Sequence, residues 1–362
     1  MLMRKLIYFA LLVTVIPIFA ACKKSISTGS QENFEHYIFF GHQVESKASL
    51  INGEDDVQSF GVVGFKYDNT TSWDEYKTKT ECTPNVFFDE KNNSPVDVET
   101  LNCTKGSPPS YTPLQGWSNT RKYTFFAFYP IGNKNVDIVS ANGSEYKGGV
   151  PAIKYSLNTG DLQGSMVDVM VSEPCKDLYY NSSEDNNLQG EDNNLQGSEV
   201  KLKFNHILSA LGVNFTKKTE NTIKINGVSM TISGIQYQTY IYPLDGVAAT
   251  PGGSTMEGSF ALSIPEGGVE VSSKGAGTEI ADKLIFIPQS QKATISLTIN
   301  YTRSAGGVSF SDVKSFTGIT TAFEAGKKHL VQLKFTDSTV KVESDVTSDA
   351  WTVVEEVNNT FN

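Results

Sequence analysis

The chain has 362 residues and a formal net charge of −10, with 30 lysines and arginines against 40 aspartates and glutamates. This acidic balance excludes the basic footprint that neutralises nucleic-acid phosphates, so we expect no nucleic-acid partner. The many glycine, phenylalanine and tyrosine residues (30, 21 and 15) favour an all-β chain, because aromatic side chains pack well on pleated sheets, and the length suffices for two sandwich-sized domains.

The amino terminus has the pattern of a secretory signal. Arg4 and Lys5 precede an apolar run that ends at Ala21, and small residues stand directly before Cys22. The run is shorter than the roughly 20 apolar residues that span a bilayer. Small residues before a cysteine resemble a bacterial lipobox, which predicts a signal peptide over residues 1–21, a diacylated Cys22 and an exported outer-membrane lipoprotein. The alternative is an ordinary signal peptide followed by a chance cysteine.

Strand-type patterns then recur along the whole chain. Residues 123–129 (YTFFAFY) are apolar on both faces, which predicts a strand buried on both sides. Residues 201–206 and 294–301 alternate apolar and polar side chains, as half-buried strands do. Turn pairs such as Gly306-Gly307 separate these runs, and no long segment has a helical period. The predicted fold class is all-β.

One heptapeptide interrupts the pattern. EDNNLQG occupies residues 184–190 and is repeated at 191–197. A tandem duplication in an exposed loop is the simplest explanation, and we expect the domain boundary there. A long insertion inside a single domain is the alternative. The predicted organisation is a signal peptide, an N-terminal β-sandwich domain, a polar loop, a C-terminal β-sandwich domain and a tail, over residues 1–21, 22–180, 181–198, 199–340 and 341–362.

Three further cysteines follow Cys22. An exported chain meets an oxidising compartment, so one disulfide is plausible among Cys82, Cys103 and Cys175. Cys82 and Cys103 bracket one loop-like stretch and are the pair we expect if any forms; the alternative is three thiols. No CxxC motif or histidine cluster occurs, so we expect no metal site.

The sequence gives no support to an enzyme. It contains no GxSxG, HExxH or phosphate-binding loop. Adjacent carboxylates such as Asp55 and Asp56 would point to opposite faces of a strand, so they do not form an acid–base pair. We therefore expect neither catalysis nor a cofactor.

Several segments resemble, in their order along the chain, the sequence of one family. They are FGVVGF at residues 60–65, Trp117 followed by YTFFAFYP at 123–130, VKLKFNHILS at 200–209, a glycine turn at 326–329, and Trp351. Together with the lipobox-like start, this order is similar to the fimbrillin family of Bacteroidales-type bacteria, which includes Mfa-like pilus lipoproteins.

The resemblance implies two transthyretin-like β-sandwich domains and a subunit of a surface fimbrium. In the stalk subunits of that family, a protease removes the lipidated N-terminal strand, and the C-terminal strand of a neighbouring pilin fills the vacated groove. The family's cut usually follows an arginine, but the arginines of this chain are Arg4, Arg121 and Arg303, and none of them directly follows the early strand expected at residues 37–44. Lys47, before Ala48, is the basic residue placed there. Either the chain is cut at Lys47, or it stays anchored by its lipid.

The last residues have one apolar face. Trp351, Val353, Val357 and Phe361 fall on alternate positions of a strand that would end at the terminus. The resemblance makes these residues a donor strand for a neighbouring subunit. The alternative is that they pair as the last strand of their own domain.

Two functions remain open at this point. The first is a structural pilus subunit that assembles by strand complementation and contributes to adhesion. The alternative is a stand-alone surface lipoprotein that binds a glycan or a host protein through aromatics such as Trp73, Tyr76 and Trp117. Large aromatics also dominate sandwich cores, so burial of these three side chains would remove this surface.

Overall fold

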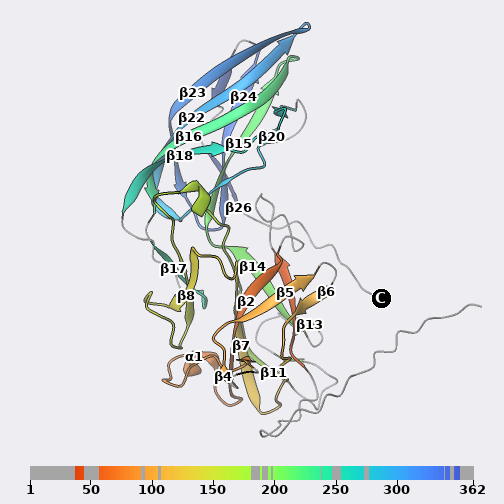
Figure 1. Ribbon diagram of the computed structural model, residues 1–362, viewed down its shortest axis with the longest axis vertical. Helices are drawn as coiled ribbons and strands as arrows, with labels where there is room; N and C mark the ends of the chain where they lie inside the picture. Colours follow the sequence, from red (N-terminus) through yellow and green to blue (C-terminus); the bar gives the residue numbers. More distant parts are fainter. Residues whose placement is uncertain are drawn as a thin grey trace, which may run out of the picture. The chain divides into compact units, whose positions relative to one another are not determined.

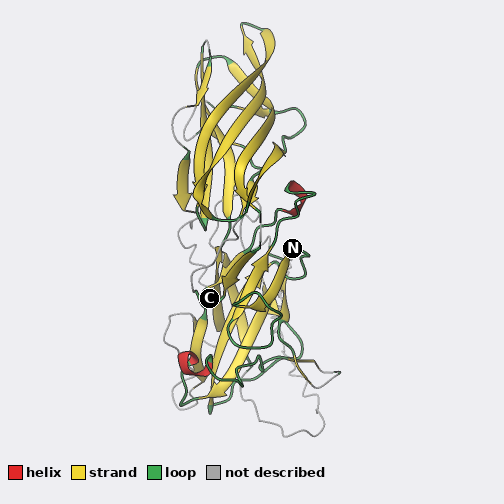
Figure 2. Ribbon diagram, turned by 90° about the vertical axis from the view of Figure 1, so that its left-hand side faces the viewer, coloured by secondary structure: helices red, strands yellow, loops and turns green. Residues whose placement is uncertain are grey.

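The computed structural model describes residues 37–44, 57–89, 91, 94–104, 107–180, 188–189, 195–196, 199–237, 239–246, 254–272, 277–337, 339–342 and 346–350. These residues form strands almost throughout, with one α-helical turn, α1 (Trp73–Tyr76), and one 3-10 turn, η2 (Gln163–Ser165) (Figures 1 and 2). The all-β prediction is confirmed. None of the described helices is long and apolar enough to cross a membrane.

A ten-stranded sheet contains the first strand of the described chain. Its main path is β1 (Phe39–Val44), β14 (Glu199–His206), β10 (Met170–Ser172), β7 (Arg121–Tyr129), β2 (Ser59–Asp68), β5 (Glu99–Thr104) and β6 (Ser107–Ser110), with β11 (Cys175–Tyr180), β12 (Leu188–Gln189) and β13 (Leu195–Gln196) attached to it. All its pairs are antiparallel except β1–β14, which is parallel.

The central strand β7 is buried on both faces because it is apolar on both sides. Tyr123 and Phe125 pack into a cluster on one face, whereas Phe126 and Phe128 pack into another on the opposite face. This is the doubly buried strand that the sequence predicts at 123–129. β14 has the alternating burial of a half-buried strand, also as predicted.

Asp177 joins several elements on this sheet. It lies between Cys175 and Leu178, where the register of β11 against β7 shifts, and it has a left-handed φ of 54°. Its carboxylate accepts hydrogen bonds from the Tyr67 hydroxyl (3.0 Å) and from the Trp73 backbone N–H (2.9 Å) at the start of α1. Burial, together with the nearby Asp177 carboxylate, raises the pKa of Tyr67, so the phenol stays protonated and can donate.

Two small sheets accompany the ten-stranded one. A three-stranded sheet has the order β17 (Tyr240–Pro243), β9 (Pro151–Tyr155) and β8 (Val136–Ser140). A two-stranded sheet pairs β3 (Phe88–Asp89) with β4 (Ser94–Pro95).

The later strands form two sheets around one apolar core. The six-stranded sheet has the path β20 (Thr278–Glu279), β15 (Ser209–Lys218), β24 (Lys327–Thr336) and β25 (Val340–Val342), with β21 (Leu284–Phe286) and β26 (Thr347–Ala350) attached. The five-stranded sheet has the path β18 (Thr255–Leu262), β16 (Thr222–Gln236), β22 (Gln289–Ala305) and β23 (Val308–Phe323), with β19 (Val269–Glu270) attached. Side chains from both sheets share one core, a sandwich arrangement.

The change between sheets comes later in the chain than the predicted boundary at 181–198. β14 follows the duplicated heptapeptide, yet it pairs with β1, β10 and β13 in the ten-stranded sheet. The next strand, β15, is the first to join the six-stranded sheet. The two heptapeptides each supply a Leu-Gln strand, β12 on β11 and β13 on β14. Composition marks the repeat but carries no information about which edge a following strand joins.

Candidate assembly site

β1 forms an edge of the ten-stranded sheet and depends on a partner far along the sequence. Phe39 pairs with Glu199 and Val44 with Phe204, in parallel register. On the described path of this sheet, β1 has β14 as its one strand neighbour. The backbone edge of β14 is therefore covered by a short strand from near the beginning of the chain.

The side chains of β1 and the residue before it divide sharply between core and surface. Ile38 and Phe40 are fully buried, whereas Phe39 is 40% exposed. The Phe40 ring lies edge-on to Phe125 at a centroid distance of 5.1 Å and to Tyr111 at 5.9 Å. Two apolar side chains thus fill sites in the core cluster that holds these aromatic rings.

Polar contacts fix the same segment. The Ile38 N–H donates to the Gln115 carbonyl (2.8 Å), and the Tyr111 hydroxyl donates to the Ile38 carbonyl (2.9 Å). Gly41 of β1 also lies close to the Glu199 side chain of β14, because a Cβ added at Gly41 would lie only 2.9 Å from the carboxylate carbon of Glu199. Removal of β1 would leave an uncovered strand edge and two apolar sites, which is the kind of groove that another strand can fill.

The predicted processing and lipidation residues are not in the described part of the chain. Cys22 precedes it, and Lys47 and Ala48 lie between Val44 and Val57, in a segment outside the described residues. A cut anywhere in that segment would separate β1 from the rest of the polypeptide.

The described carboxyl end pairs within its own sheet. β26 runs antiparallel to β24, with Thr347 opposite Leu330 and Ala350 opposite Lys327. Trp351, which begins the predicted donor strand, lies outside the described residues, as do the other three members, Val353, Val357 and Phe361. Any donated segment would therefore follow Ala350.

The Cys82–Cys103 disulfide is not formed in the structure, where both residues are free thiols. Cys82 packs into the cluster that contains Phe126, and Cys103 packs against the cluster that contains Phe125. These clusters lie on opposite faces of the ten-stranded sheet. Burial raises the pKa of each thiol to about 11, so both stay protonated at neutral pH and react slowly.

The three aromatic side chains of the alternative binding function are core residues. Trp73 is 0%, Trp117 3% and Tyr76 7% exposed. They contact other rings: Trp73 lies 4.8 Å from Phe65, and Trp117 lies 4.8 Å from Tyr123. These residues therefore do not form a binding surface for a glycan or a protein.

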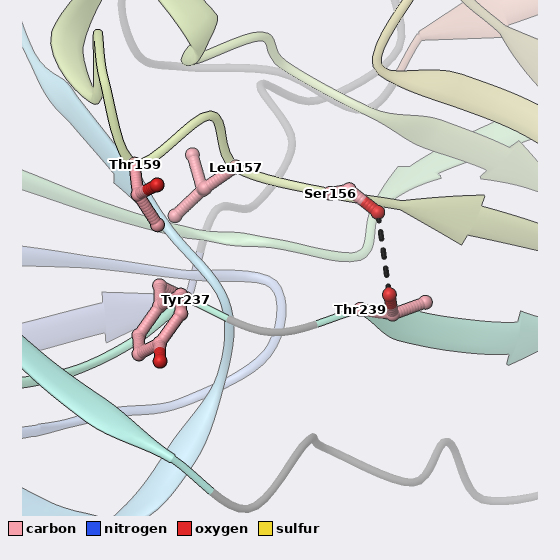
Figure 3. Close-up of a pocket in the computed structure, with 5 residues that line it drawn as sticks. All are labelled: Ser156, Leu157, Thr159, Tyr237 and Thr239. Carbon is pink, nitrogen blue, oxygen red and sulfur yellow. Dashed lines mark hydrogen bonds between the residues drawn. The ribbon is translucent and has the colours of Figure 1, made fainter.

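A pocket of about 440 Å³ opens beside the end of β9 and the start of β17. In Figure 3, Ser156 and Thr239 face each other with their hydroxyl oxygens 3.4 Å apart, and Tyr237 lies below Leu157 and Thr159. The residues that line it offer hydroxyl groups and no charged side chain. No group of three or more metal-ligating side chains occurs within the described residues.

Comparison with known proteins supports one family. The model of the fimbrillin-like family matches residues 68–351, most of the chain. A fimbrial protein from Bacteroides vulgatus ATCC 8482 has the same fold, with a TM-score of 0.54 at 18% identity over 87% of this chain and 99% of that one. A candidate cell adhesion protein from Bacteroides uniformis ATCC 8492 aligns with a TM-score of 0.44 at 15% identity, over 87% and 99%.

No curated protein matches the chain. The family match begins at Asp68, the last residue of β2, so it includes most strands of the ten-stranded sheet but not β1, as well as the two later sheets. It supports a role in a pilus or in adhesion at the cell surface. The chain belongs to the fimbrillin-like family, and it is a structural protein rather than an enzyme.

Proposed function

We propose that the chain is a fimbrial subunit that joins like subunits by strand complementation. The observation that carries the proposal is β1, a short parallel edge strand in which Phe40 is fully buried, as is Ile38 directly before it. One cut after β1 releases it from the rest of the chain, and its buried apolar side chains leave sites that another strand can fill.

In this mechanism a cut after Lys47 frees β1, and the tail of another subunit occupies its place beside β14. Trp351, Val353, Val357 and Phe361 supply the alternate apolar side chains of the incoming strand. Backbone hydrogen bonds to the β14 edge provide affinity, while the sites vacated by β1 select the side chains.

The test uses a version of the full chain in which residues 45–50 are replaced by the recognition site of a specific protease. After cutting, a synthetic peptide of residues 351–362 should bind, whereas the uncut protein should not bind it. A peptide with Val353→Asp and Val357→Asp is the matched control and should fail in both cases. Equal binding to cut and uncut protein, or no binding to either, would contradict the proposal.

Before assembly, the proposed subunit is held at the outer membrane by a lipid on Cys22. Cys22→Ser should then move the protein from the membrane fraction to the soluble fraction, because the acyl chains supply the membrane affinity. The check is fractionation followed by mass spectrometry of the amino-terminal peptide. Unchanged partitioning of the variant would refute the lipid anchor without affecting the strand-exchange proposal.

A further inference from the structure

β23 presents an unusual edge. Within the described residues it pairs with β22 alone, so its other side faces away from the five-stranded sheet (Figure 1). Six large hydrophobic side chains of the described chain are exposed, and three of them belong to this strand: Val308 (54%), Phe310 (61%) and Val313 (60%). Exposed apolar side chains on a long sheet edge favour pairing with another strand.

The sequence of this edge is complementary to itself. Residues 310–316 read Phe-Ser-Asp-Val-Lys-Ser-Phe. The segment is the same in both directions except that Asp312 on one side of Val313 is matched by Lys314 on the other. An antiparallel pair of two such segments centred on Val313 places each acid opposite a base and each outer phenylalanine opposite another.

The backbone has the right phase for that pairing. Gly306 and Gly307, both with positive φ, form the two-residue turn between Ala305 and Val308. In a hairpin with a two-residue turn, the two residues that flank the turn form a hydrogen-bonded pair. Non-hydrogen-bonded and hydrogen-bonded pairs then alternate along the two strands. Counted from Val308, the odd-numbered residues from 309 to 315 therefore point their N–H and C=O groups to the free edge.

One hydrogen bond of the structure agrees with this phase. The Val313 N–H donates to its neighbour's carboxylate, Asp312 Oδ1, at 2.8 Å, so it does not point into the β22 ladder. Asp312 Oδ2 accepts a hydrogen bond from the Tyr301 hydroxyl at 2.9 Å. In the single copy, Asp312 thus covers the central N–H group of the edge.

We infer that the β23 edge is a two-fold contact between two copies of this chain, paired antiparallel about Val313. The Val313 N–H gives up the Asp312 carboxylate of its own chain and donates instead to the carbonyl of Val313 in the other copy. Asp312 keeps Tyr301 and gains Lys314 of the other copy. The Asp312–Lys314 and Phe310–Phe316 pairs occupy non-hydrogen-bonded positions, where side chains approach most closely.

This contact differs in kind from strand donation. A two-fold contact uses the same patch on both copies and closes on itself, whereas donation runs head to tail and can continue into a filament. The inference therefore goes beyond the proposed function. It supplies a lateral link between two subunits, and it involves neither β1 nor residues 351–362.

A self-cross-link tests the geometry in the full-length chain, purified in detergent. Val313→Cys lies on the two-fold axis, where paired Cα atoms are about 5.5 Å apart, within disulfide range. Ser311→Cys is the matched control on the same strand and the same face. Its two copies would lie about 13 Å apart along the strand, too far to bridge. We expect a disulfide-linked dimer with Val313→Cys and none with Ser311→Cys, measured on non-reducing gels against the parent chain.

Charge reversal tests the specificity of the pairing. Each charge variant is made in the Val313→Cys chain, and the yield of disulfide-linked dimer is measured. Lys314→Asp alone and Asp312→Lys alone each place like charges opposite one another, and each should lower the dimer yield by on the order of tenfold. A mixture of the two variants should restore the yield, because acid again faces base across the contact. Asp312→Lys removes the Tyr301–Asp312 hydrogen bond, whereas Lys314→Asp leaves it in place. If Asp312→Lys lowers the melting temperature, the result for Lys314→Asp therefore decides the test.

Equal cross-linking of the Val313→Cys and Ser311→Cys chains would overturn the inference. A dimer yield that the charge reversals leave unchanged would overturn it as well. Such a result would not bear on strand donation, because the protease and peptide experiment measures binding at the edge of β14 and not at the edge of β23.

Discussion

Truncation of the chain after Ala350 should abolish assembly while leaving the subunit folded. β26 ends at Ala350 and is retained, so the pairing of β24 with its neighbours stays complete. The deletion removes Trp351, Val353, Val357 and Phe361, the side chains proposed to enter another subunit. Burial of such a side chain is worth about 1.5–3 kcal/mol, so the loss of four removes most of the driving force.

Electron microscopy of cells and the melting temperature of the purified chain together check this result. Truncation after Val346 is the control: it also removes β26, and it should lower the melting temperature because Lys327 to Leu330 lose a paired strand. Filaments that persist after the shorter deletion would exclude the tail as the donor. A large drop in melting temperature after the shorter deletion would show that the tail belongs to its own sheet.

Phe40→Ala should lower the free energy of detaching β1 from β14 by about 3–5 kcal/mol, the usual effect of truncating a buried phenylalanine. The Phe40 ring is fully buried and contacts Phe125 and Tyr111, so the substitution leaves a cavity as well as losing apolar contact. Amide hydrogen exchange of β14 measures the effect directly, because the β14 amides that face β1 lose protection when β1 detaches, whereas those that face β10 and β13 stay paired.

Phe39→Ala is the matched control for this substitution. It removes the same ring from the adjacent residue, on the opposite and 40% exposed face, and should change exchange along β14 little. Equal effects of the two substitutions would show that β1 is not held by its buried face. The uncut chain should also become more accessible to the peptide of residues 351–362 when Phe40 is replaced, since the same site is vacated.

The sequence predicted the character of individual strands better than their partners. The apolar run at 123–129 and the alternation at 201–206 both correspond to observed strands with the expected burial. Such patterns report which faces are buried, but they do not report which edge a strand joins. The parallel pairing of β1 with β14 therefore could not be read from local sequence, and neither could the late change of sheet at β15.

The same limit applies to the candidate site. The family resemblance pointed to an early strand as the removable element, and the structure adds which side chains hold it. Cys82 and Cys103 looked like partners because they bracket one segment, yet a sheet separates them, since linear spacing does not reveal opposite faces. The symmetry of residues 310–316 was visible in the sequence, but its meaning depends on β23 being an edge strand.

The parallel pairing of β1 has a consequence for the order in which the chain folds. Phe39 precedes its partner Glu199 by about 160 residues, so a chain made from its amino terminus produces β1 long before β14 exists. Contacts between residues so distant in sequence carry a large loop-closure cost and form late. We therefore expect the β14 edge to stay uncovered until this late pairing, and β1 has the advantage of being tethered to the same chain. In the proposed mechanism, this tethering protects each new subunit from premature partners until the covalent link is cut.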